Sequence, residues 1–219
     1  MKRDVQKTTL ARQVAGNEAT VPRRLPTQQR SRERVERMLD IATTLIAEAG
    51  SDALRMSEVA EKAGVSIGSL YQYFPDKAAV IRTLAERYNA QGRACVAAEL
   101  AKVAKIGDLS AALERVTDGY YAMFIAEPVM LDIWSGTQAD KTLQEMDAED
   151  GRAHAAMLSE VLARLYPAAD FKQCQSAAFL LMHLIAATVR LAISLPRTDG
   201  DAVIEGFKRM VLEDFRFRL

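Results

Sequence analysis

The stretch SEVAEKAGVSIGSLYQYFPDKAAV, residues Ser57–Val80, decides the fold of this chain. Its first part, Ser57–Ala63, spaces its apolar residues as the single buried stripe of a short helix. Gly64 suits the left-handed end of that helix, and the Ser66 hydroxyl can cap the next one. A proline then ends the second helix, and Asp76 can cap a third. Two short helices around a glycine turn predict a helix-turn-helix, although an ordinary αα-corner has the same pattern.

The outward face of the second helix favours a DNA reader over an αα-corner. Leu70 and Phe74 are four residues apart and can anchor the inner face. A solvated helix of this length would carry Glu and Lys, whereas a helix facing phosphates needs hydrogen-bonding tips without negative charge. Lys77 adds a cation close to the positively biased N-terminus of the third helix. The residues that remain to point outward or sideways are all neutral: Gly68, Ser69, Tyr71, Gln72 and Tyr73.

The run AGVSIGSLYQYFPDKAAV follows a basic amphipathic helix and resembles the N-terminal DNA-binding domain of the TetR family of bacterial repressors. The resemblance extends from about Arg30 to Tyr88. It rests on the A-G-V-S turn, the L-Y-x-Y-F ending of the second helix, and the lysine three residues beyond that ending; together these markers are specific. The family commonly has a threonine entering the first helix of the motif, where this chain has Arg55 and Met56. We therefore expect Ser57 to cap that helix one position later.

The resemblance and the places of residues on these helices together assign the expected DNA contacts. We expect contacts that position the DNA backbone from Ser57, Tyr73 and Lys77. Arg30 and Arg32 are candidates for the phosphates or the minor groove. The implied partner is double-stranded DNA with a palindromic operator, read by a dimer in successive major grooves. The start of the recognition helix and its base-edge candidates are Ser66, Ile67, Gly68, Ser69, Tyr71 and Gln72.

The net charge of zero averages two different parts of the chain. Residues 1–88 hold 15 Lys and Arg against 11 Asp and Glu, whereas residues 89–219 hold 14 against 18. The basic excess is concentrated in Val21–Arg37, where six arginines accompany two glutamates. An arginine run alone indicates a solvated face. Beside a helix-turn-helix it favours contact with phosphates or the minor groove.

Helical patterns account for nearly all of the sequence, so we predict an all-α fold of about nine helices. We expect a flexible basic arm at 1–25, a three-helix DNA-binding domain at 26–88, and an effector-binding and dimerisation domain at 89–219. Besides the two short helices of the motif, the predicted helices are Thr27–Ala49, Asp76–Ala104, Asp108–Glu127, a short segment at Pro128–Ser135, Lys141–Tyr166, Phe171–Leu195 and Gly200–Arg216.

The last two predicted helices bear on assembly. The middle of Phe171–Leu195, AAFLLMHLIAATV, is apolar nearly all round and therefore requires burial on several sides. A two-fold homodimer built from this helix and Gly200–Arg216 supplies the second covering surface, as the resemblance also implies. The alternative is a monomer in which this helix is fully internal.

The resemblance further implies a transcriptional repressor that is released from its operator by a small, largely apolar molecule. This effector binds in the C-terminal domain and favours one spacing of the two DNA-binding heads. Arg190 could pair with an acidic ligand, but an ion pair at the dimer interface is the preferred interpretation. The alternative function is a regulator of the same fold that has no small-molecule ligand or answers to a protein partner.

Methionines and aromatics favour an adaptable, largely apolar pocket, although each also fits an ordinary core position. These candidates are Tyr120, Met123, Phe124, Trp134, Met157, Phe179, Met182 and His183.

Little in the sequence favours catalysis, a cofactor or a metal. Asp147, Asp150 and His154 share one helix face, but neighbouring glutamates favour a solvated surface over a metal site. No Ser/His/Asp or Cys/His set, nucleotide loop or apolar carboxylate pair presents itself, so we do not expect an enzyme. An N-terminal apolar segment is absent, and the uncharged run Gln173–Val189 is shorter than a membrane span. We therefore expect a cytoplasmic protein without a membrane partner.

Overall fold

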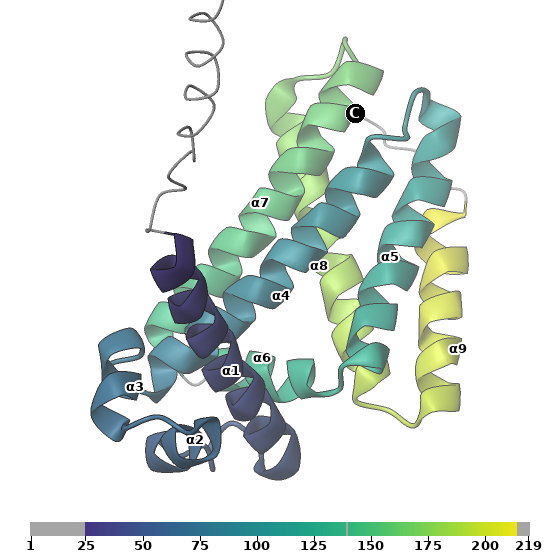
Figure 1. The fold of residues 1–219 in the computed structure, drawn as a ribbon. Helices are drawn as coiled ribbons and strands as arrows, with labels where there is room; N and C mark the ends of the chain where they lie inside the picture. Colours follow the sequence, from purple (N-terminus) through teal and green to yellow (C-terminus); the bar gives the residue numbers. More distant parts are fainter. Residues whose placement is uncertain (1–24, 139, 214–219) are drawn as a thin grey trace, which may run out of the picture. The chain divides into compact units, whose positions relative to one another are not determined.

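The computed structural model describes residues 25–138 and 140–213, and within them every regular element is a helix (Figure 1). The predicted all-α fold is confirmed. A 3₁₀-helix at Ile106–Asp108 precedes α5, and a π-helical segment at Lys208–Leu212 follows α9. The α-helices are α1 (Leu25–Ala49), α2 (Met56–Ala63), α3 (Ile67–Tyr73), α4 (Lys77–Leu100), α5 (Leu109–Ala126), α6 (Val129–Gln138), α7 (Lys141–Leu165), α8 (Phe171–Ile193) and α9 (Arg197–Phe207).

The N-terminal end of the described chain is a unit of its own. Residues up to Glu36 cluster separately from Arg37–Leu219, so the first half of α1 is described by itself. The predicted arm, residues 1–25, lies outside the described residues except for Leu25, where α1 begins.

The turns of the helix-turn-helix follow from local sequence signals. Gly64 ends α2 with φ of 67°, a left-handed conformation that costs glycine little. The Ser66 hydroxyl caps α3 by accepting the N–H of Ser69 at 3.1 Å. Asp76 caps α4 in the same way, accepting the N–H of Ala79 at 2.7 Å. All three predicted helix boundaries are therefore present.

The expected cap at Ser57 is wrong. Helix α2 begins at Met56, and Arg55 occupies the N-cap position without a side-chain hydrogen bond. The reason lies in the backbone, because the Arg55 carbonyl already accepts the N–H groups of Glu58 and Val59, each at 3.1 Å. Ser57 therefore lies inside the first turn, with its side chain exposed.

Three predicted boundaries in the C-terminal part differ from the structure by three residues or more, one of them the end of α6, which lies at Gln138 rather than Ser135. Helix α4 ends at Leu100 rather than Ala104, because the Asp108 carboxylate accepts the N–H groups of Ala104 and Lys105 and holds them in a turn. Helix α9 begins at Arg197, three residues before the predicted start at Gly200. The predicted end of this helix, Arg216, lies outside the described residues.

The core of the C-terminal part lies between α4, α5, α7 and α8, which supply nearly all of its buried side chains. Helix α7 packs along α8, and α8 also packs on α9. Helix α4 leaves the helix-turn-helix and continues into this bundle, where it contacts α5, α6 and α7 (Figure 1). A single helix therefore connects the helix-turn-helix to the core.

Helix α8 is apolar on two faces, of which only one is covered. Leu181, Ile185 and Val189 are buried in the core. On the other face Leu180 is 61% exposed and Leu191 is 54% exposed. By length and composition alone, this helix could cross a membrane, although the uncharged run Gln173–Val189 had suggested a shorter segment. Core helices of soluble proteins meet the same criteria, so this is weak evidence for a membrane span.

Candidate DNA-binding surface and central cavity

Helix α3 has one buried face and one neutral exposed face. Leu70 and Phe74 are 0% and 4% exposed, so they anchor the helix as predicted. On the opposite side Ile67 and Tyr71 are 43% and 48% exposed. Large apolar and aromatic side chains on an outward face indicate a contact surface rather than a solvated one. Gly68 and Gln72 are also exposed, whereas Ser69 and Tyr73 are half-buried.

Lys77 connects the start of α4 to the turn between α1 and α2. Its ammonium group donates to the carbonyl of Asp52 at 3.1 Å. An ammonium has three donors, so this bond leaves two for a phosphate oxygen. Lys77 is thereby held at the helix N-terminus, where the helix dipole also favours an anion.

Arg30 and Arg32 lie on the first turns of α1, within the separate N-terminal unit. Both side chains are exposed. Nearby on the same unit, Gln29 donates to Glu33 at 3.0 Å. The arginines thus belong to a solvated, mixed-charge helix segment, and their predicted DNA contacts stay a prediction.

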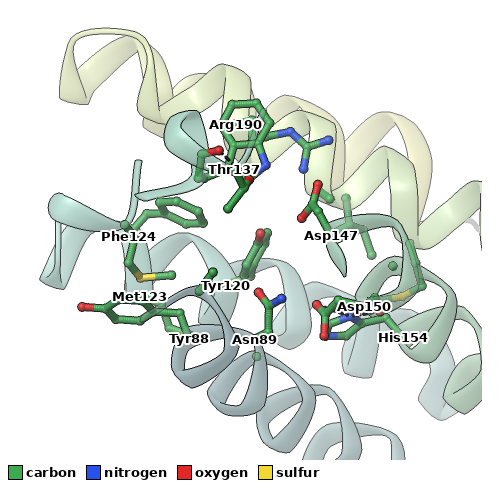
Figure 2. Close-up of a pocket in the computed structure, with 18 of the residues that line it drawn as sticks. Tyr88, Asn89, Tyr120, Met123, Phe124, Thr137, Asp147, Asp150, His154 and Arg190 are labelled. Atoms are coloured by element: carbon green, nitrogen blue, oxygen red, sulfur yellow. Dashed lines mark hydrogen bonds and ion pairs between the residues drawn. The ribbon is translucent and has the colours of Figure 1, made fainter. Parts of the chain in front are cut away.

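A cavity of about 430 Å³, here named the central cavity, lies among α4, α5, α6, α7 and α8 (Figure 2). Its volume is within the range of pockets that hold drug-sized ligands. In Figure 2, Met123 and Phe124 lie at one end of the view, and Asp147, Asp150 and His154 lie at the other. The cavity therefore has an apolar end and a charged end.

Of the eight pocket residues predicted from the sequence, six line the central cavity. The other two lie elsewhere: Met157 packs against the buried core, and Phe179 is 46% exposed with its ring 4.0 Å from that of His183. The six lining residues are Tyr120, Met123, Phe124, Trp134, Met182 and His183.

The charged lining was not foreseen. Asp147, Asp150 and His154 line the cavity rather than a solvated surface, so their predicted exposure is wrong. Their shared helix face was visible in the sequence, but which way that face points depends on the packing of α7 against α4 and α8. The polar lining that the sequence did not indicate also includes Tyr88, Asn89, Thr137, Gln138 and Gln144. Arg190, which the sequence suggested as a partner for an acidic ligand or for an ion pair at a dimer interface, lines the cavity as well.

Asp150 holds a cluster of charges at one wall of the cavity. It pairs with Arg93 of α4 and with the Nδ1 atom of His154, the latter at 3.2 Å. Burial opposes the charged form of His154, but hydrogen bonding to Asp150 and its negative charge outweigh that effect and raise the pKa of His154. The ion pair between Arg93 and Asp150 therefore joins α4 and α7 next to the cavity.

Tyr120, Trp134 and Arg190 meet at another part of the lining. The guanidinium carbon of Arg190 lies 5.1 Å from the centre of the Trp134 ring. Burial raises the pKa of Tyr120 to about 12; the neighbouring Arg190 opposes this shift, whereas Asp147 and Asp150 add to it. The indole N–H of Trp134 is buried without an acceptor among the described residues. Such a donor is costly unless a ligand or water satisfies it.

Helix α6 contacts both the cavity and the turn that precedes the helix-turn-helix. Its residues Ile133, Trp134 and Thr137 line the cavity. Its Gly136 abuts the turn after α1 so closely that an added Cβ would lie 2.9 Å from the Ser51 hydroxyl. A displacement of α6 by a bound molecule therefore reaches Ser51 through direct contact.

The two parts of the sequence match two family models. Residues 38–84 match the model for bacterial regulatory proteins of the tetR family, and residues 107–216 match the tetracyclin repressor-like C-terminal domain. A segment of 46 residues is 46% identical to the HTH-type transcriptional repressor KstR of Mycolicibacterium smegmatis, covering 21% of this chain and 22% of that protein. The KstR repressor of Rhodococcus jostii is likewise 46% identical over 46 residues, so the chain matches about a fifth of the length of these curated relatives.

Solved structures resemble the chain over most of its length. A TetR-family transcriptional regulator from Streptomyces coelicolor is 28% identical, with a TM-score of 0.60 over 82% of this chain and 94% of that one. The regulator FadR from Bacillus subtilis, solved in complex with stearoyl-CoA, is 18% identical, with a TM-score of 0.61 over 82% and 96%. The second similarity concerns the fold alone.

Proposed function

Because this chain belongs to the TetR family of bacterial transcriptional regulators, we propose that it is a cytoplasmic repressor that binds an operator in double-stranded DNA. A small molecule in the central cavity releases it from that operator. The family is one of regulatory DNA-binding proteins and not of enzymes. The observation that carries the proposal is the exposed neutral face of α3 beside a tethered lysine at the start of α4.

The chemistry of α3 supports base reading. Tyr71 and Gln72 present hydrogen-bonding groups on the exposed face, and Ile67 can contact a thymine methyl group. Lys77 and the α4 N-terminus can bind a phosphate and so set the register of the helix on the duplex. Repression agrees with the description of the KstR relatives as repressors.

A homodimer through α8 and α9 agrees with the uncovered apolar face of α8. Leu184 and Leu191 lie seven residues apart on this face, 41% and 54% exposed. Two such faces related by a two-fold axis cover each other and place two α3 helices for a palindromic operator.

The central cavity favours a small-molecule effector over a regulator without a ligand. Its lining includes side chains of α4, which continues into the DNA-binding motif, and of α6, which abuts Ser51. A ligand that binds better to one arrangement of these helices changes the spacing of the two motifs and hence the affinity for the operator.

The DNA-binding part of the proposal is tested with the chain's own promoter region, labelled for fluorescence anisotropy at several salt concentrations. For Tyr71→Ala we expect an affinity loss of about 5- to 150-fold per half-site of the operator, since one base contact contributes roughly 1–3 kcal/mol. For Lys77→Ala we expect weaker binding to all sequences and a salt slope reduced by about one unit per lost phosphate contact.

Lys105→Ala provides the matched control, because Lys105 is an exposed lysine of the C-terminal part. We expect its affinity and salt slope to equal those of the unaltered chain. If Tyr71→Ala and Lys77→Ala also bind unchanged, α3 is not the recognition helix.

A further inference from the structure

We infer that the central cavity binds a compact amphipathic monocarboxylate, whose carboxylate contacts Arg190 and the indole N–H of Trp134 and whose apolar body lies against Met123 and Phe124. The inference rests on the proposed function, because it specifies the chemistry of the effector at that same site. The inferred ligand is a free acid and not a thioester that carries phosphates.

The head-group end of the cavity combines donors from three helices. Arg190 comes from α8, Trp134 from α6 and Tyr120 from α5, and all three line the cavity. The buried Trp134 N–H has no acceptor among the described residues. A ligand oxygen placed here accepts that hydrogen bond and removes the cost of the unsatisfied donor. The Tyr120 hydroxyl is a third potential donor.

The charge of Arg190 makes an anionic oxygen a better partner than a neutral one. Its neighbours Trp134 and Tyr120 are uncharged, and no ion pair joins Arg190 to an acid within the described part of the chain. Asp150 is in the opposite situation, since it already pairs with Arg93 and His154. Hydrogen bonds between a guanidinium and a carboxylate are about twice as strong as neutral ones. Arg190 is therefore the cation available to a ligand.

The rest of the lining fits an apolar body. Phe124 packs edge-on against Tyr120, with ring centres 5.2 Å apart, and Met123 lies beside it at the same end of the view in Figure 2. Val116 and Ile185 extend this apolar wall. A flexible methionine next to rigid aromatic rings accommodates bodies of different shape. The ligand therefore joins a single polar head to a body of moderate size.

A ligand with several phosphates does not fit the charges of this lining. Arg190 is the sole lysine or arginine among the residues that line the cavity, whereas Asp147 and Asp150 both contribute carboxylates. Phosphates brought inside would face these acids with one compensating arginine. The cavity thus suits the free acid rather than a coenzyme A thioester, unlike the ligand named for the Bacillus subtilis structure.

Trp134 makes the inference measurable, because it is the one tryptophan of the sequence. We would titrate the full chain with decanoate and 4-phenylbutyrate, each beside its methyl ester, and with decanoyl-CoA, following Trp134 emission. Melting-temperature shifts serve as a second readout. Each acid is expected to bind about 10- to 100-fold more tightly than its ester and than decanoyl-CoA.

Two variants with opposite expected effects separate specific binding from damage to the fold. Arg190→Gln should weaken binding of the acids about 10- to 100-fold and leave the esters unchanged. Asp147→Asn should tighten binding of the acids, because it removes a negative charge that acts on the same Tyr120 hydroxyl as Arg190. Arg197→Gln is the matched control, since Arg197 also lies over a ring, that of Tyr121, but outside the cavity.

Equal affinities for acid and ester, unaltered acid binding in Arg190→Gln, or no binding of either acid would each overturn the inference. Release from promoter DNA is measured separately by anisotropy. If the acids bind at Trp134 but the DNA stays bound, the ligand class stands and the proposed release mechanism fails. If other compounds release the DNA and the acids do not bind, the proposed function stands and the ligand class is wrong.

Discussion

His154 owes its raised pKa to Asp150, through both its carboxylate and its backbone carbonyl. The Nδ1 atom of His154 lies 2.8 Å from that carbonyl and 3.2 Å from the carboxylate, which also pairs with Arg93, so three titratable groups share one half-buried wall. Because the pKa of His154 is raised in the fold, protonation stabilises the folded chain. This contribution is fully present below the ordinary histidine pKa of 6.5 and is lost as the pH rises through the higher folded value.

We predict that His154→Gln makes the free energy of unfolding less dependent on pH. The unaltered chain should lose stability relative to this variant as the pH rises from below 6.5 through the raised pKa. Urea unfolding at a series of pH values measures the difference. His183→Gln is the control, because no acid pairs with His183 among the residues described. A difference between unaltered chain and His154→Gln that stays constant with pH contradicts the prediction.

At the scale of elements, the contact between α8 and α9 depends on a glycine. Gly200 lies inside α9, and a Cβ there would overlap the Ala192 carbonyl oxygen of α8 and lie 2.9 Å from the Tyr121 hydroxyl. The sequence indicated Gly200 as the start of the helix. Glycine is disfavoured inside helices, but here it permits an approach that other residues would prevent.

We predict that Gly200→Ala destabilises the chain by about 1–3 kcal/mol, because the overlap with backbone cannot be relieved by turning a side chain. Gly206→Ala in the same helix is the matched control, since nothing lies within 4 Å of its added Cβ. For Gly206→Ala we expect the free energy of unfolding to rise by about 0.5–1 kcal/mol, because alanine has a higher helix propensity than glycine. Chemical unfolding measures both, and equal effects of the two substitutions would show that α8 and α9 do not pack this closely.

At the scale of the whole molecule, the uncovered face of α8 is the surface on which the proposed homodimer rests. Leu180, Leu184 and Leu191 form a stripe along the helix that the described chain leaves exposed. Stripes of this kind on a soluble protein mark interaction surfaces. In the proposed homodimer, a second copy of the chain would cover the stripe with the same residues, as a two-fold interface requires.

We predict that Leu184→Glu or Leu191→Glu weakens the homodimer at least about 100-fold, because each two-fold interface would bring two like charges together at a cost of several kcal/mol. Sedimentation at graded concentrations gives the dimer Kd. Ile106→Glu is the control, since Ile106 is similarly exposed, at 48%, but lies on the 3₁₀-helix before α5. A chain that is monomeric before substitution, or dimeric after it, refutes this interface.

Much of the fold could be predicted because its signals are local. The cap residues Ser66 and Asp76 and the turn at Gly64 act within four residues of themselves, so the sequence shows them directly. The prediction for Ser57 was wrong because the first backbone hydrogen bonds of α2 end on the Arg55 carbonyl, a group that every residue has, and no side chain caps this helix. The end of α4 was misplaced since Asp108 reaches back to bind two backbone N–H groups.

The sequence by itself determined the all-α fold and the helix-turn-helix, because caps, turns and helical periodicity act over a few residues. The tertiary structure alone decided the chemistry of the central cavity. Arg93 and Asp150 are 57 residues apart in the chain, and Arg190 meets Trp134 across a similar separation. Periodicity places a side chain on a face of its helix, but only the packing of five helices decides that this face borders a cavity rather than solvent.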